Sequence, residues 1–264
     1  MKLGFIGAGN MSGAILDGVL KGGLLQAEQL WVSNRHQDKL ERFARLGVHT
    51  TTDNCRVARE ADLVILGIKP QMFGEVLPQI ADEVKGKGVL SISPGYSLAW
   101  LREQLPGCHV MRAMPNTPLL VGKGCTALAQ KSGDVPEDLF EEVKAVFSSA
   151  GEVFVVPEDL IDAVIAIAGS SPAYFFRMAD AMVQAGQALG LEPEQALRMA
   201  ALTMEGSARM LLESGKTAGE LARQVCSPGG TTLAALTAFD DHHFEGMVNE
   251  AMERCVRRSQ ELGK

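Results

Sequence analysis

Lys2-Leu-Gly-Phe-Ile-Gly-Ala-Gly-Asn-Met11 is the stretch that decides the fold of this chain. Leu3–Ile6 is a short apolar run, typical of a buried strand, and it leads directly into a glycine turn that extends to Gly13. Apolar residues then recur at helical spacing over residues 10–20, and two glycines end the pattern. Strand, glycine turn and helix in this order form the setting in which a G-x-G turn binds the pyrophosphate of a dinucleotide.

Each part of that turn has a physical task. The first glycine permits the tight turn, the second lets the backbone approach the pyrophosphate, and the helix N-terminus supplies N–H donors and partial positive charge. The turn predicts cofactor contacts at Gly7, Ala8, Gly9, Asn10 and Met11. A plain strand-turn-helix without a ligand is the alternative.

Apolar runs alternate with helical patterns up to about residue 156. The predicted strands are 3–6, 30–33, 48–51, 63–68, 89–93 and 110–113, with 125–129 and 152–156 as further edge strands; the predicted helices are 10–20, 38–46, 54–60, 72–84 and 137–147. Such nearly continuous apolar strands indicate a parallel sheet with helices on both faces.

After residue 157 the sequence contains no convincing strand. Apolar helical patterns cover 171–189, 193–213, 218–225, 231–239 and 244–262. The predicted fold is therefore an α/β, Rossmann-type, doubly wound sheet in residues 1–156, followed by an all-α dimerisation domain in residues 157–264. Residues 179–189 are apolar around most of a helix, and a domain this small needs a partner subunit to bury them.

The composition narrows the possible partners. The formal net charge is −7, and Arg257-Arg258 is the only basic pair that stands out, so nucleic acid and anionic membranes are poor partners. The longest apolar runs, 63–68 and 163–168, are too short to span a bilayer, and the start of the chain lacks the pattern of a signal peptide. The 5 cysteines form no C-x-x-C pair, which favours free thiols in the cytoplasm and no metal site.

The end of the second strand indicates which dinucleotide is bound. NAD enzymes usually place a carboxylate there to bind the ribose 2′-hydroxyl. Residues 29–37 contain no Asp and no Glu. Ser33, Asn34 and Arg35 instead suit a 2′-phosphate. We therefore expect NADP(H), with NADH possible but weaker. A solvated Arg35 is the alternative. Asn54, which opens the next helix, is either a helix cap or a further contact on the adenosine side.

Three further loops follow predicted strands, at the edge where open α/β sheets bind ligands. They contribute Ile68, Lys69 and Pro70, then Ser93 and Pro94, then Asn116. We expect these residues to contact the cofactor, with a plain surface lysine as the alternative for Lys69.

Two polar segments interrupt the helical half. Gly169-Ser-Ser-Pro172 lies in an uncharged stretch and suits either a buried helix junction or a site. Ser227-Pro-Gly-Gly-Thr-Thr232 opens a helix whose N-terminus suits a carboxylate, with a simple N-cap turn as the alternative. No lysine occurs between Lys144 and Lys216, so a base for hydroxyacid chemistry is missing; an imine nitrogen, being more basic than a carbonyl oxygen, can enter already protonated.

At these residues the chain resembles the pyrroline-5-carboxylate reductases. The motifs that carry the resemblance are Gly4–Met11, Ile68–Pro70, Met114-Pro-Asn-Thr-Pro118, Glu158–Ala163, Gly169–Tyr174 and Ser227–Thr232. The resemblance implies NADPH-dependent reduction of the C=N bond of 1-pyrroline-5-carboxylate to L-proline, the last step of proline biosynthesis. It also implies a homodimer through the helical domain, assembled in some members into a decamer.

The resemblance further implies roles for single residues. Gly230, Thr231 and Thr232 would bind the substrate carboxylate, Thr232 would also serve the ring nitrogen as the catalytic hydroxyl, and Glu158 would lie at the substrate site. Ser171 and Cys226 depart from residues common in the family. Two rival functions stay open: a hydroxyacid or imine reductase of the same architecture, and a non-catalytic protein that senses NADP or handles pyridoxal phosphate.

Overall fold

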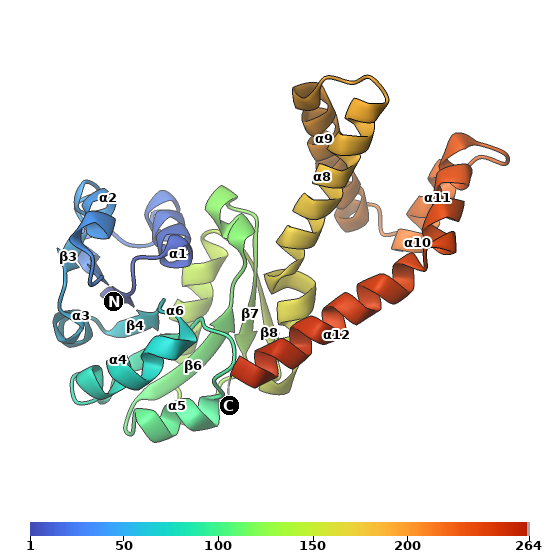
Figure 1. The fold of residues 1–264 in the computed structure, drawn as a ribbon. Coiled ribbons are helices and arrows are strands. Elements are labelled where there is room, and N and C mark those ends of the chain that lie inside the picture. Colours follow the sequence, from blue (N-terminus) through green and yellow to red (C-terminus); the bar gives the residue numbers. More distant parts are fainter. Residues whose placement is uncertain (263–264) are drawn as a thin grey trace. The chain divides into compact units, whose positions relative to one another are not determined.

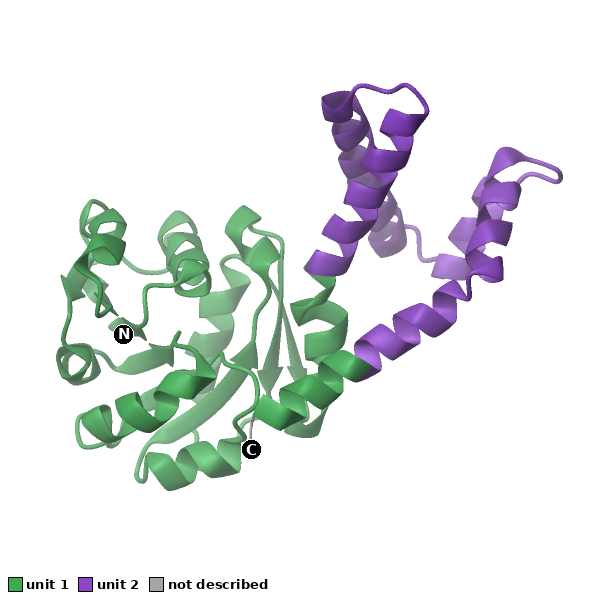
Figure 2. Cartoon of the chain, viewed as in Figure 1, with its two compact units in different colours: residues 1–172, 254–264 green, residues 173–253 purple. Residues whose placement is uncertain are grey.

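The computed structural model describes residues 1–262 and contains two compact units (Figures 1 and 2). Unit 1 comprises residues 1–172 together with the end of the chain from residue 254, and it contains the whole sheet. Unit 2 comprises residues 173–253 and contains helices. Each unit is described by itself.

Eight strands form the sheet in the order β3-β2-β1-β4-β5-β6-β7-β8. Their bounds are β1 Leu3–Ile6, β2 Leu30–Ser33, β3 His49–Thr51, β4 Leu63–Leu66, β5 Gly88–Ser91, β6 His109–Met114, β7 Gly124–Ala129 and β8 Gly151–Val156. The chain leaves β1 toward β2 on one side and reaches β4 on the other, so the strand order reverses between β1 and β4. Ligands of open α/β sheets bind at such a reversal, which here lies beside the glycine turn.

Two expectations about the sheet were wrong. The strand predicted at 125–129 is not an edge strand, because β8 pairs along its outer side and is itself the edge. The sheet is also not wholly parallel, since β7 runs antiparallel to β6. Only a short 3-10 helix, Thr117–Val121, joins β6 to β7, whereas a parallel neighbour needs a long crossover connection.

Helices cover both faces of the sheet, as predicted. Their bounds are α1 Asn10–Lys21, α2 Glu41–Ala44, α3 Asn54–Glu60, α4 Phe73–Ile80, α5 Leu98–Gln104 and α6 Glu137–Ser148. Alternation along β1 produces two cores: Leu3 and Phe5 pack with α1 and α6, whereas Ile6 packs with α3, α4 and α5. The sheet is therefore doubly wound.

Two helices differ from the sequence prediction. The helix expected at 38–46 is a 3-10 turn, Gln37–Leu40, followed by the four-residue α2. Only Leu40 and Phe43 are buried there, too few to stabilise a long helix. The pattern also missed α5, which buries only Leu98 and Leu101 and begins at Ser97, whose hydroxyl accepts a hydrogen bond from the Trp100 N–H.

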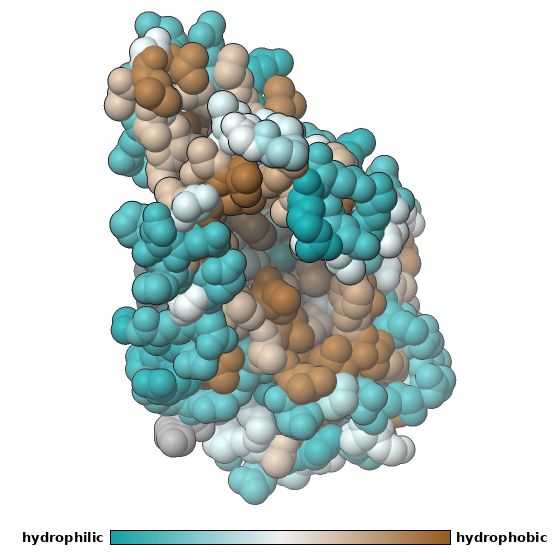
Figure 3. Space-filling model, turned by 90° about the vertical axis from the view of Figure 1, so that its right-hand side faces the viewer, coloured by the Kyte–Doolittle hydropathy of each residue, from teal (hydrophilic) through white to brown (hydrophobic). Residues whose placement is uncertain are grey.

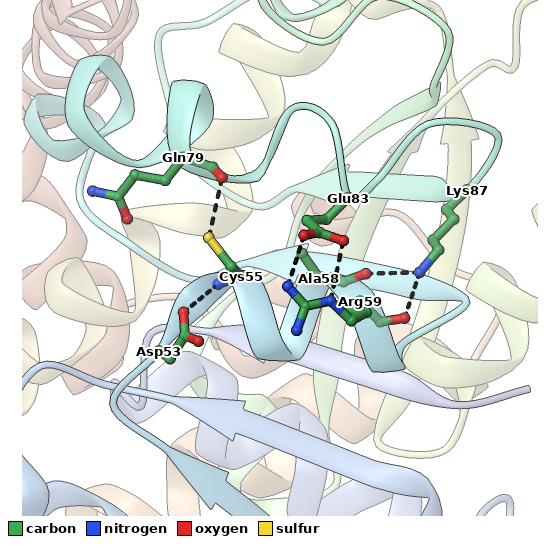
Figure 4. Close-up of polar contacts among 7 residues, drawn as sticks. All are labelled: Asp53, Cys55, Ala58, Arg59, Gln79, Glu83 and Lys87. Carbon is green, nitrogen blue, oxygen red and sulfur yellow. Dashed lines mark hydrogen bonds and ion pairs between the residues drawn. The ribbon is translucent and has the colours of Figure 1, made fainter.

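Polar side chains fasten α3 to α4 and to the chain that follows it (Figure 4). The Arg59 guanidinium donates to Glu83 at 2.8 Å, and this contact lowers the pKa of the Glu83 carboxyl. The Lys87 ammonium donates to the carbonyls of Ala58 and Arg59 at 2.8 and 2.7 Å, where the helix dipole favours a cation. These contacts hold the helix that begins at Asn54.

Residues 157–172 belong to unit 1, although the predicted domain boundary precedes them. They form a 3-10 turn (Glu158–Leu160), α7 (Ile161–Val164) and a π-helical turn (Ile165–Gly169). Ile161 and Ile165 lie in the core of unit 1, and the end of α12 (Phe244–Leu262) joins them through a hydrogen bond from Ser259 to Asp162. The boundary between residues 156 and 157 remains a prediction.

Unit 2 buries little of its apolar surface. Its elements are α8 (Ser171–Ala188), α9 (Pro193–Glu213), α10 (Ala218–Val225), α11 (Thr231–Asp241) and the first part of α12. Phe176, Leu189 and Leu212 are 70%, 86% and 81% exposed. Figure 3 shows brown, apolar side chains at the surface of the face in view.

One continuous helical stretch, Glu158–Ala188, is long and apolar enough to cross a membrane by length and composition alone. Of its most apolar window 33% is buried, and core helices of water-soluble proteins meet the same criterion.

Candidate cofactor and substrate site

The glycine turn after β1 packs tightly against the end of β4. Gly7 has a φ of +106°, which side chains rarely adopt, and a Cβ there would lie 2.5 Å from the Gly67 carbonyl oxygen. The Gly7 N–H donates to the Ser33 carbonyl at 2.9 Å, and the Gly67 N–H donates to the Ile6 carbonyl at 2.9 Å. The turn is therefore joined to both neighbours of β1.

The start of α1 is open to a ligand. Gly9 is its N-cap, and no side chain accepts a hydrogen bond from the first turn. A Cβ on Gly9 would meet only the Gly67 oxygen, at 3.9 Å, so there is open space beside the N-cap residue. Gly9 and Asn10 are exposed, whereas Ala8 and Met11 are half-buried. This cradle fits a pyrophosphate, which needs close backbone approach and unpaired N–H donors.

The predicted adenosine residues lie together at the end of β2. Ser33 is buried, and its hydroxyl donates to the Asn54 Oδ1 at 2.7 Å, so it orients Asn54. Asn54 is the first residue of α3 but not its cap, because the carboxylate of Asp53 accepts from the Cys55 N–H. Asn34 accepts from the His36 N–H, and the exposed Arg35 donates through Nε to the His36 ring at 3.1 Å. The Arg35 guanidinium and the Asn34 side-chain amide nitrogen are thus available to a ligand at the carboxyl end of β2.

The loops after β4 and β5 are cross-linked. The Ser93 hydroxyl donates to the Ile68 carbonyl at 2.7 Å, which brings two predicted cofactor segments together. Lys69 is exposed and forms no ion pair within residues 1–262, so its ammonium is free to meet a phosphate. Pro70 begins a 3-10 turn, and Pro94 is half-buried beside Ser93.

Asn116 connects parts of unit 1. Its amide nitrogen donates to the Ala168 carbonyl at 3.1 Å, and its oxygen accepts from the Cys125 N–H at 2.9 Å. It is buried, so these contacts give it a structural task, and its contact with the cofactor stays a prediction. A Cβ on Gly169 would lie 3.3 Å from the Met114 side chain, so the end of β6 and the π-helical turn lie side by side.

Glu158 lies in a charged cluster that the sequence analysis missed. Its carboxylate accepts from the Leu98 N–H at 2.6 Å and lies 3.5 Å from the Arg112 guanidinium. The same guanidinium lies 3.8 Å from Asp162, and the Arg112 side chain is only 7% exposed. The signal in the sequence was a lone charge inside the apolar strand pattern at 110–113, since a buried charge requires partners.

The predicted carboxylate site lies in unit 2, at the N-terminus of α11. Gly230 is the N-cap, and no side chain satisfies the first N–H groups of this helix. The preceding turn is set by Gly229, with φ of +68°. Thr231 is exposed and Thr232 half-buried, so one helix end presents backbone donors and two hydroxyls. In the part of the chain that the structure describes, no cluster of His, Cys, Asp or Glu could hold a metal ion.

A doubly wound sheet with an open glycine cradle at its reversal point defines the class as dinucleotide-dependent oxidoreductases. Two family models match: the NADP oxidoreductase, coenzyme F420-dependent, over residues 2–95, and pyrroline-5-carboxylate reductase dimerisation over residues 158–262. The pyrroline-5-carboxylate reductases of Escherichia coli and Methanosarcina acetivorans are 38% and 36% identical to the chain, each over 100% of it and 98% of the relative. The chain belongs to the pyrroline-5-carboxylate reductase family.

Solved structures agree. The Plasmodium falciparum pyrroline carboxylate reductase, solved with NADP bound, has a TM-score of 0.91 at 27% identity and covers 100% of this chain and 98% of its own. The Coxiella burnetii pyrroline-5-carboxylate reductase has a TM-score of 0.89 at 34% identity with the same coverage. An imine reductase from Myxococcus stipitatus, at 17% identity and a TM-score of 0.58, shares the fold.

The two glycines of the turn should respond differently to substitution. Gly9→Ala places a methyl group in the open cradle, so we expect the Kd for NADPH to rise about tenfold or more while the melting temperature changes little. Gly7→Ala forces a strained φ and a clash with Gly67, so the melting temperature should fall by about 5 °C or more. Fluorescence titration and thermal unfolding measure both effects. Unchanged NADPH binding by Gly9→Ala would contradict the assignment of the cradle.

Proposed function

We propose that the protein reduces 1-pyrroline-5-carboxylate to L-proline with NADPH, the last step of proline biosynthesis. The observation that carries this proposal is the full-length relationship to pyrroline-5-carboxylate reductases, at 38% identity for the Escherichia coli protein. In the reaction the C=N carbon gains a hydride and the ring nitrogen retains a proton. When bound, NADPH supplies that hydride.

The residues of unit 1 bind and orient the cofactor. The turn from Gly7 to Met11 holds the pyrophosphate, because the first turn of α1 has no side-chain cap and the glycines leave room. Asn34 and Arg35 bind the 2′-phosphate, and Ser33 acts by orienting Asn54. These side chains favour NADP(H) over NADH, since a guanidinium pairs with phosphate and would gain little from a 2′-hydroxyl.

The residues of unit 2 hold the substrate anion. Thr231 and Thr232 offer backbone N–H groups at the uncapped start of α11, where the helix dipole favours a carboxylate. The Gly230 N–H donates to the Ser227 carbonyl at 2.9 Å, so Gly230 serves the anion as the N-cap residue without a side chain in the way. Thr232 places its hydroxyl beside the ring nitrogen. Positioning in a dry pocket supplies most of the rate, because an imine nitrogen needs no strong acid or base.

Glu158 serves the substrate site by positioning. Its carboxylate accepts from the Leu98 N–H and lies beside the Arg112 guanidinium, so it joins the start of α5 to β6. The absence of a lysine between Lys144 and Lys216 also disfavours hydroxyacid oxidation as the activity.

The exposed apolar helices support a homodimer through residues 157–264. Phe176, Leu189 and Leu212 lie open in the single chain, and the dimerisation model matches residues 158–262. A decamer of such dimers is the assembly that we propose beyond this. Burial of these apolar faces in the dimer explains the apolar composition of the helical stretch Glu158–Ala188 without insertion into a membrane. The net charge of −7 disfavours binding to nucleic acid, which is itself negatively charged. Five free cysteines suit the cytoplasm.

The reaction is tested by following NADPH absorbance with pyrroline-5-carboxylate, a small 2-ketoacid and an unrelated cyclic imine as parallel substrates. We expect efficient turnover of pyrroline-5-carboxylate alone.

Thr232→Val should lower kcat about tenfold or more with unchanged NADPH affinity, because one hydrogen bond in the transition state is lost. Thr232→Ser keeps the hydroxyl and should retain activity. Full activity in Thr232→Val would refute the role of the hydroxyl.

Cofactor choice depends on Arg35. Arg35→Ala should raise KM for NADPH about 10- to 100-fold and leave KM for NADH within about twofold, because only the phosphate loses a charge-assisted hydrogen bond. Arg45→Ala is the matched control, since Arg45 pairs with Glu41 on an exposed face of the same unit. Equal loss with both cofactors would show that Arg35 does not contact the 2′-phosphate.

Association through the helices depends on their exposed apolar side chains. Phe176→Glu should shift the protein toward the monomer in sedimentation experiments, because burying a new carboxylate opposes association. Leu46→Glu changes a 47% exposed side chain of unit 1 and should leave the oligomer intact. An unaltered oligomer in Phe176→Glu would place the interface elsewhere.

A further inference from the structure

Three aromatic rings lie in one stack beside the loops after β4 and β5. The Tyr96 ring is 4.9 Å from the Phe73 ring, with 15° between their planes, and 4.0 Å from the Trp100 ring, with 22° between them. Phe73 is fully buried, whereas Tyr96 and Trp100 are half-buried. The rings come from three places: the first residue of α4, the loop after β5, and α5.

The stack joins two segments that follow adjacent parallel strands. Phe73 comes directly after Lys69–Met72, and Tyr96 comes directly after Ser93–Gly95. Gly95, with φ of +97°, makes the turn that precedes Tyr96. The Phe73 and Trp100 rings also contact each other, with 6.3 Å between their centres, so the Tyr96 ring packs against both members of a pair. The same two segments are joined a second time by the hydrogen bond from Ser93 to the Ile68 carbonyl. Two independent contacts thus set the spacing between the loops.

We propose that Tyr96 is a positioning residue: its stacked ring holds the loop after β5 against the loop after β4, and so fixes the spacing of the two segments that flank the nicotinamide end of the cofactor. The nicotinamide end is assigned to these loops because β4 and β5 lie on the opposite side of β1 from the adenosine residues of β2. The inference therefore rests on the proposed function, which includes that cofactor. Offset aromatic pairs stabilise contacts beyond the area that they bury.

The ring, not the hydroxyl, performs this task. Within residues 1–262 the Tyr96 hydroxyl has no hydrogen bond to another side chain or to the backbone, whereas its ring has two stacked partners. The start of α5 is held independently, by the contact of the Leu98 N–H with Glu158. Tyr96 therefore fixes the middle of a loop whose two ends, Ser93 and Leu98, are already fastened.

The test compares Tyr96→Phe with Tyr96→Leu. Phenylalanine keeps the stack, so Tyr96→Phe should match the parent in kcat and in the Kd for NADPH within about twofold. Leucine removes both ring pairs that Tyr96 makes and leaves only the contact between Phe73 and Trp100, so the Kd for NADPH should rise about threefold or more, as expected for the loss of two aromatic pairs. Turnover of pyrroline-5-carboxylate should fall as well.

The control ligand is adenosine 2′,5′-bisphosphate, which is the adenosine half of NADP without the second phosphate of the pyrophosphate, the second ribose and the nicotinamide. Its Kd should be the same for the parent and for Tyr96→Leu, because it lacks the part of the cofactor that the two loops flank. An equal loss of affinity for both ligands would show general damage and overturn the proposal, and so would a large drop in kcat for Tyr96→Phe, which would assign the hydroxyl to catalysis. The binding measurements use no pyrroline-5-carboxylate, so they stand apart from a failure of the proposed reaction.

Discussion

The close approach of two backbone segments, Gly7 after β1 and Gly67 after β4, is the constraint on which the cofactor site depends. A side chain at Gly7 would lie 2.5 Å from the Gly67 carbonyl oxygen, and one at Gly67 would overlap the Ser12 hydroxyl. Because both positions lack a Cβ, the first turn of α1 sits directly over the sheet reversal with its N–H groups uncapped. The pyrophosphate site that we propose is therefore made by backbone, and we propose that side chains at neighbouring strand ends select which dinucleotide binds.

Around this cradle, the main task of the polar contacts is to set the positions of the loops. Ser33 orients Asn54, Ser93 joins Ile68, and Glu158 holds the start of α5. Arg112, buried in β6, lies beside the carboxylates of Glu158 and Asp162, and Asp162 accepts from Ser259 near the end of the chain. A buried guanidinium with two carboxylates contributes little net stability but fixes one arrangement of its partners. In this way the last helix is fastened to the sheet unit that binds the cofactor.

Unit 2 obeys a different constraint. Its helices expose large apolar side chains such as Leu189 and Leu212, because a short helical region has too little interior to bury them. Association with a second copy would remove that surface from water, so the proposed homodimer and the helical region that contains α11 depend on the same hydrophobic effect. Our proposal thus gives the two units separate tasks: the backbone of unit 1 binds the dinucleotide, and the apolar helices of unit 2 support the anion site and the oligomer.

By itself, the sequence determined the features that local patterns encode. The strands Leu3–Ile6 and Leu30–Ser33 and the helices Asn54–Glu60 and Pro193–Glu213 lie where their apolar spacing predicts, and the glycine turn and Ser33–Arg35 indicated a dinucleotide with a 2′-phosphate. Only the tertiary structure decided that β7 runs antiparallel to β6 and that the Asn116 amide donates to the Ala168 carbonyl. The same holds for the partners of Arg112 and for the ring contacts of Tyr96. Each of these depends on residues far apart in the chain, such as Arg112 and Glu158 or Asp162 and Ser259. The periodicity of one segment does not contain such a pairing, because the pairing depends on how distant segments pack in three dimensions.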